Sequence, residues 1–110
     1  MQFLNLTPHD IKIFAQDGIT LDRVIPASGK VARLDKRDGE TFNVDGIVFK
    51  RPHFGDPLDL PEADQETMLI VSAMVRTAPA LLSRTDLASP ADFVRDASGQ
   101  VLGCRSFDLN

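Results

Sequence analysis

The residues of this chain that could do chemistry are few and widely spaced. His9 lies in the tetrapeptide Thr-Pro-His-Asp (7–10), between two apolar runs. A histidine can act as a general acid or base, or contact an anion, because imidazole titrates near neutral pH. The alternative is a plain turn, since Pro8 favours a turn and Thr7 and Asp10 can cap its backbone. Both interpretations of His9 remain open from the sequence.

The other nucleophiles and soft metal ligands form no recognisable motif. Ser72 and Ser106 lie outside any G-x-S-x-G elbow, and Cys104 follows a glycine within an expected strand, where a small buried side chain is usual. His9, His53 and Cys104 lack the CxxC or HxxxH spacing of a structural zinc site. We therefore expect no metal site and no cofactor.

An anion site is the more specific hypothesis. A strand over 67–71 is followed by an expected helix, whose first turn would present free N–H groups beside Ser72. Arginine guanidinium groups suit bidentate contacts to anions, although nearby aspartates could instead hold them in ion pairs. The candidate ligand-binding residues are His9, Ser72, Arg76, Arg84 and Arg95, and His9 is also the candidate catalytic residue.

Composition narrows the class of protein. The 110 residues suit a single domain, 1–110, and the proportions of hydrophobic and charged residues are ordinary for a globular chain. A net charge of −4 argues against general nucleic-acid binding, which needs a basic surface. The chain has one cysteine, no signal-peptide pattern and no apolar run long enough to span a bilayer, so we expect no membrane partner and a cytoplasmic location.

The first half of the chain predicts short strands separated by turns. Asp-Gly pairs at 17–18 and 45–46 are strong hairpin signals, and 35–40 is expected to be a charged turn. The expected strands are 3–6, 11–14, 19–25, 30–34, 41–44 and 47–50. This spacing favours an antiparallel meander or a small, partly open barrel.

The second half predicts the remaining elements. Residues 51–66 contain three prolines and five acidic residues, which predicts an irregular loop more mobile than the sheet. A main helix is expected at about 72–83, with a kink or two short helices at Pro79. Ser-Pro at 89–90 predicts a short helical turn, and 92–107 predicts a final hairpin. The expected fold class is α+β, with a flatter sheet carrying the helix on one face as the alternative to a closed form.

Several motifs, taken in order, resemble a known group of proteins. They are NLTPH (5–9), SGKVAR (28–33), LPE (60–62), LIVSAMV (69–75) and DFVRDASGQVLGCRS (92–106). The chain resembles, over nearly its whole length, uncharacterised small proteins of phages, prophages and other mobile elements that open with NLTPH. The resemblance implies a phage or mobile-element gene product located in the cytoplasm of a bacterial host, and it carries no established activity.

Three functions follow as hypotheses. The first is an accessory binding protein, in counter-defence for example, that engages a host protein or a small phosphorylated molecule. The second is a metal-independent nucleotide or phosphodiester hydrolase that uses His9. The third is a virion or structural assembly component. The first is preferred, because the catalytic constellations of known enzyme classes are missing.

Overall fold

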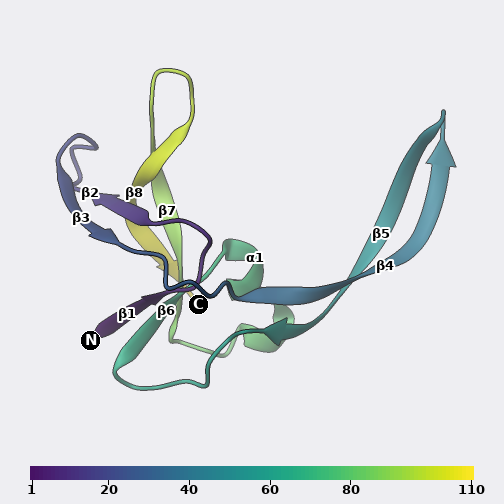
Figure 1. Cartoon of the computed structure of the whole chain (residues 1–110), viewed down its shortest axis with the longest axis horizontal. Coiled ribbons are helices and arrows are strands. Elements are labelled where there is room, and N and C mark those ends of the chain that lie inside the picture. The colour runs from purple at the N-terminus through teal and green to yellow at the C-terminus, as the bar shows by residue number, and fades with distance from the viewer.

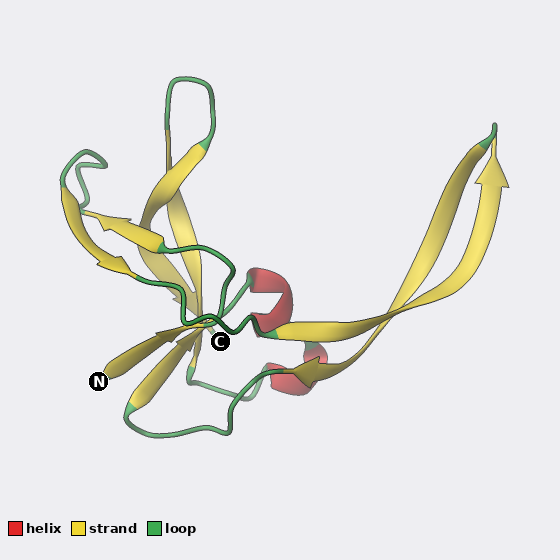
Figure 2. Cartoon of the chain, in the orientation of Figure 1, coloured by secondary structure: helices red, strands yellow, loops and turns green.

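A mixed six-stranded sheet and a separate long hairpin make up most of the computed structural model, which describes all 110 residues (Figures 1 and 2). The strands are β1 (Gln2–Asn5), β2 (Ile11–Phe14), β3 (Leu21–Ile25), β4 (Arg33–Val44), β5 (Ile47–Leu58), β6 (Thr67–Ile70), β7 (Leu87–Arg95) and β8 (Val101–Leu109). A four-residue helix, α1 (Ala73–Arg76), and a 3-10 turn, η1 (Pro79–Leu81), lie between β6 and β7.

The strand order in the sheet is β1-β6-β7-β8-β2-β3. Two hairpins, β2–β3 and β7–β8, are antiparallel, as their turn residues predict. The pairs β1–β6, β6–β7 and β2–β8 are parallel. The antiparallel meander or barrel is therefore wrong in detail: the sheet is mixed and open, within the expected α+β class. The reason is that the turn at 7–10 sends β1 and β2 to different partners instead of to each other.

The long hairpin projects away from the sheet, and we call residues 33–58 the arm (Figure 1). Its two strands turn at Asp45 and Gly46, whose φ angles of 52° and 80° suit the tight turn that Asp-Gly predicts. The expected charged turn at 35–40 is wrong, because these residues continue β4 through bulges in its pairing with β5.

The expected loop at 51–66 is wrong over its first half. Residues 51–58 belong to β5, and only 59–66 are irregular. Pro52 and Pro57 lie in this strand. Prolines are tolerated in a two-stranded ribbon because each strand has one free edge, and a nitrogen that points there is not needed for a ladder hydrogen bond. The expectation that this whole segment is more mobile than the sheet loses its basis for 51–58.

The single main helix at 72–83 is also wrong. Ser72 is the N-cap of α1, as predicted, and its hydroxyl accepts a hydrogen bond from the Val75 amide at 3.3 Å. The helix ends at Arg76, and Pro79 begins η1. Proline cannot continue an α-helix because it lacks the amide donor, so the break anticipated at Pro79 divides the segment into two short pieces.

The short helical turn expected at 89–93 is wrong as well, because these residues lie within β7. Pro90 is tolerated in this strand since β6 pairs with β7 only as far as Ala88, which leaves the far side of β7 free. Asp92 has a φ of 49°, a local distortion within the strand.

The core has two parts, on the two faces of β6. Leu69 and Val71 face one part, together with Val75 of α1 and Leu87 of β7. Ile70 faces the other. This second part also contains Ile11, Ile25 and Cys104, and Cys104 is buried as the sequence predicts. Successive strand residues point to opposite faces, so both sides of β6 are covered. No helix of the structure has the length and apolar character that crossing a membrane requires.

Candidate functional site

Asn5 holds the NLTPH segment together. Its side chain is 1% exposed and makes four hydrogen bonds. The amide nitrogen donates to the carbonyl oxygens of His9 at 2.8 Å and Ile25 at 3.1 Å. The amide oxygen accepts from the Thr7 amide at 3.0 Å and from the Thr7 hydroxyl at 2.6 Å. Asn5 thus connects the end of β1, the turn and the end of β3.

Asp10 and His9, the other polar residues of the turn, differ in the role of their side chains. The Asp10 carboxylate accepts from the Ala27 amide at 2.8 Å, so it anchors the neighbouring loop. His9 contributes its backbone oxygen to the turn, while its exposed imidazole makes no hydrogen bond to the protein. The turn positions a free imidazole without using it for structure.

That imidazole lines a pocket of about 450 Å³. The pocket lies between the turn, the start of α1 and the β7–β8 hairpin. Its polar wall includes His9, Lys12 and Ser72. Its apolar wall includes Phe93, Val101 and Leu102, each of which is nearly half exposed. The lining of the pocket therefore combines a lysine and polar residues with an aromatic residue and aliphatic neighbours.

Cys104 also lines this pocket, but it is 1% exposed. Burial raises the pKa of its thiol, and the weak hydrogen bonds with Ala91 and Ser106 only partly oppose that effect. A raised pKa leaves the thiol protonated at neutral pH, so Cys104 is poorly suited to act as a nucleophile.

Arg76 is committed to the C-terminal segment. Its guanidinium donates to the Ser89 hydroxyl at 2.7 Å, to the Leu109 carbonyl at 3.4 Å and to the Asn110 side chain at 3.1 Å. It does not line the pocket of His9 and Ser72. The proposed sharing of an anion between His9 and Arg76 therefore has no support from the arrangement of their side chains.

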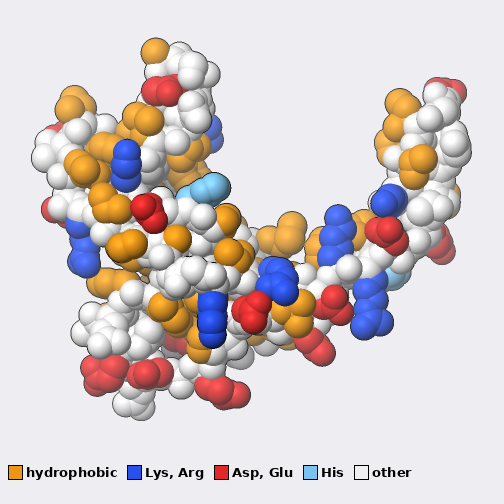
Figure 3. Space-filling model, viewed as in Figure 1, with side chains coloured by type: hydrophobic (Ala, Val, Ile, Leu, Met, Phe, Trp, Pro, Cys, Tyr) orange, Lys and Arg blue, Asp and Glu red, His pale blue; other side chains and the backbone are white.

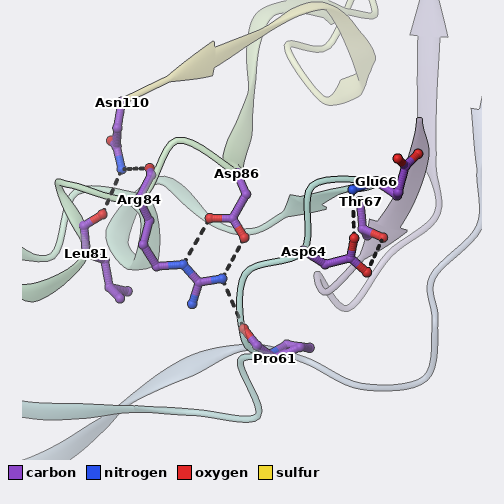
Figure 4. A network of polar contacts seen from close by, with 8 residues as sticks. All are labelled: Pro61, Asp64, Glu66, Thr67, Leu81, Arg84, Asp86 and Asn110. Carbon is purple, nitrogen blue, oxygen red and sulfur yellow. Dashed lines mark hydrogen bonds and ion pairs between the residues drawn. The ribbon is translucent and has the colours of Figure 1, made fainter.

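Arg84 and Arg95 also have structural partners. Arg84 binds Asp86 in a bidentate pair, at 2.9 and 2.6 Å, and donates to the Pro61 carbonyl at 3.0 Å (Figure 4). Arg95 donates to the Gly99 carbonyl at 2.9 Å and lies over the Phe93 ring, with 6.0 Å from its guanidinium carbon to the ring centroid. Of the five candidate residues, His9 and Ser72 line one pocket, Arg76 and Arg84 do not line it, and Arg95 adjoins it only through its contact with Phe93.

Three residues of interest were missed from the sequence. Lys12 alternates with the core residue Ile11 in β2, so its outward position could have been found from strand periodicity. Phe93 was not identified because a short helical turn, and not a strand, was expected at 89–93. Asn5 carried a readable signal, since a polar side chain inside the apolar run Phe3–Leu6 indicates a buried hydrogen-bonded role.

A second hollow, of about 550 Å³, lies beside the Arg84–Asp86 pair. Its other polar walls include Asp64, whose carboxylate caps the Glu66 amide at 2.7 Å (Figure 4). The charged groups here bind one another or the backbone. No three His, Cys, Asp or Glu side chains of the structure are grouped so that they could hold a metal ion.

The Arg84–Asp86 pair predicts a specific pH dependence. Hydrogen bonds from Arg84 lower the pKa of the Asp86 carboxyl, and partial burial opposes part of that shift. A carboxyl whose pKa is lowered by folding stabilises the fold above its unfolded pKa, and this stabilisation is lost as the pH falls through the folded-state value. Asp86→Asn should therefore be less stable than the parent chain at pH 7, and the difference should shrink between about pH 5 and pH 2.

Urea unfolding at a series of pH values measures this difference. Asp56→Asn is the matched control, because the Asp56 carboxylate makes no ion pair or hydrogen bond and its loss should change stability little. A difference for Asp86→Asn that stays constant down to pH 2 would contradict the assigned role of the pair.

No protein-family model, curated protein or solved structure matches this chain. Its functional interpretation therefore depends on the geometry described above.

Proposed function

We propose that this chain is an accessory binding protein of a phage or another mobile element, and that it binds a small phosphorylated molecule in the pocket beside His9. The resemblance of the NLTPH and VRDASGQVLGC segments to such proteins supports the origin. Counter-defence is one role that such binding could serve. The observation that carries the proposal is the pocket itself, whose lining combines polar and apolar residues.

The two walls suit two parts of one ligand. Lysine is a common phosphate ligand, and Lys12 lines the same pocket as the uncommitted imidazole of His9. Arg95 lies over one face of the Phe93 ring, so a planar base can stack on the other face, and Val101 and Leu102 also line the pocket. The Asp10 carboxylate is occupied by the Ala27 amide, which lessens its repulsion of an anion. A nucleotide-like ligand combines both parts.

Binding without turnover is preferred to hydrolysis. A general base needs a nucleophile or a positioned water, and the only cysteine at the pocket is buried with a raised pKa. The hydrolase remains the alternative because His9 is free, and turnover of any phosphoester in the assay below would favour it over binding alone.

The test is calorimetric titration of the purified chain with nucleotides and cyclic oligonucleotides, together with product analysis. We expect binding without turnover, and Lys12→Ala should weaken it about tenfold or more, the effect of losing a charge-assisted contact. His9→Ala should also weaken binding, while changing the free energy of unfolding by less than about 0.5 kcal/mol, as for most surface substitutions.

Lys30→Ala is the matched control, because Lys30 is exposed and lies outside the pocket. Equal weakening by Lys12→Ala and Lys30→Ala would indicate nonspecific attraction and count against the site. An absence of binding across the whole panel would reject the phosphorylated ligand.

A structural assembly component is the second candidate, and the exposed arm favours it. An assembly protein of this kind should form large, open-ended oligomers, and size-exclusion chromatography with light scattering would detect them.

A further inference from the structure

The arm has one apolar face and one more polar face near its tip. Directly paired residues share a face, and the pairs Phe42–Phe49 and Val44–Ile47 therefore form one apolar surface. The pairs Thr41–Lys50 and Asn43–Val48 lie on the opposite face. We call the surface of Phe42, Val44, Ile47 and Phe49 the tip face.

The chain covers the tip face only in part. Its four residues are between 41% and 60% exposed, and the apolar side chains near the end of the arm stand clear of the body in Figure 3. Arg51 lies over the Phe42 ring, with its guanidinium carbon 5.3 Å from the ring centroid. A two-stranded ribbon without packing on either face is at best marginally stable in water. The base of the arm packs against the core through Leu34, but the outer part of its twelve-residue strands calls for a stabilising contact from outside the chain.

The dimensions of the molecule indicate how large that contact is. The radius of gyration is 16.5 Å, whereas a compact chain of this length has one of about 13 Å. The accessible surface is 7578 Å², against about 6,000 Å² for a monomer of this mass. The excess of roughly 1,500 Å² falls in the range that each partner of an obligate homodimer buries, about 1,000 to 2,500 Å². The tip face alone is too small for this, so the contact extends along the arm.

The charge of the arm and the stoichiometry of the contact indicate which partner covers the arm. The arm carries five basic residues (Arg33, Lys36, Arg37, Lys50 and Arg51) and five acidic ones (Asp35, Asp38, Glu40, Asp45 and Asp56). It is therefore neutral, whereas the chain as a whole has a net charge of −4. A neutral ribbon of mixed charge does not repel a second copy of itself. A surface that must stay covered needs a partner that is always present in an equal amount, and a second copy of the same chain meets that condition. We infer that the arm is an interface with a second copy of this chain, and that the tip face is its apolar centre.

Sedimentation equilibrium of the purified full chain over a dilution series tests this inference. The parent chain should have twice the 12.1 kDa mass of the single chain. Ile47 and Val48 provide a matched pair of sites, since they are adjacent, equally exposed at 60% and on opposite faces. Ile47→Asp should weaken dimerisation about 100-fold, as expected when a charge replaces an interface anchor, whereas Val48→Asp should leave the dimer intact.

Phe49→Lys is a second variant on the tip face and should behave as Ile47→Asp does. Circular dichroism would show whether each variant keeps the strand content of the parent chain. A parent chain that is monomeric at all concentrations would overturn the inference and assign the arm to a different protein. Equal dissociation by Ile47→Asp and Val48→Asp, or a ladder of larger oligomers in place of a dimer, would also overturn it.

Discussion

Replacing Asn5 with alanine is expected to lower the free energy of unfolding by about 3 kcal/mol, because it removes four hydrogen bonds from a buried position. The carbonyl oxygens of His9 and Ile25 would lose a donor, and the Thr7 amide would lose an acceptor. Buried polar groups without partners cost more than the net value of the lost bonds. Urea unfolding followed by circular dichroism measures the loss.

Two further variants separate this role from simple loss of volume. Asn5→Asp keeps the acceptor but turns a carboxylate toward two carbonyl oxygens, so it should destabilise at least as strongly as Asn5→Ala. Thr7→Val removes one hydroxyl at the edge of the same network and should cost only about 1 kcal/mol. A loss below about 1 kcal/mol for Asn5→Ala would mean that the turn is held by Pro8 and not by Asn5.

The second large effect is expected at Gly103. A Cβ atom at this position of β8 would overlap the backbone carbonyl of Lys12 and approach a ring carbon of Phe14 to 2.8 Å. β2 and β8 pair only at Ile13 and Cys104, so Gly103 lies at the one point where these strands are joined. The backbone of Lys12 cannot move aside as a flexible side chain could. Gly103→Ala should therefore destabilise the fold by about 2 to 3 kcal/mol, the range for overpacked sites.

Gly55→Ala is the matched control for this effect. Gly55 also lies in a strand, but a Cβ there would meet only Asp35, at an ordinary distance of 3.6 Å. This substitution should be neutral or slightly stabilising, since alanine lowers the entropy of the unfolded chain. Thermal unfolding of both variants makes the comparison, and similar midpoints would show that β2 and β8 can separate without loss.

Local sequence signals predicted the structure correctly where they concern a turn between neighbouring strands or the start of a helix. Asp-Gly pairs predicted both early hairpins, and Ser72 was identified as an N-cap. The length of the arm was not predicted because prolines and charged residues are typical of a loop. Both are acceptable in a ribbon whose edges are free. The parallel pairings were missed because no local pattern states which distant strand a strand will join.

The candidate site was predicted in part for the same reason. His9 and Ser72 lie at two ends of short connections, and their meeting depends on the β6–β7–β8–β2 order of the sheet. For the arginines, spacing alone left ligand binding and pairing with a nearby aspartate as alternatives. The structure pairs Arg84 with Asp86, whereas Arg95 donates to the Gly99 carbonyl and makes no ion pair.

The pairing of β1 with β6 has a consequence for the order of folding. Gln2 pairs with Thr67, so β1 has no partner in the sheet until more than sixty further residues have been synthesised. The arm, whose strands are joined by a two-residue turn, has only local contacts to form and can assemble in the meantime. A nascent chain would thus expose its apolar tip face before its sheet is complete. Slow synthesis or a truncated product would leave the exposed apolar surface of the arm without the folded sheet. The arm is therefore the segment most prone to aggregation.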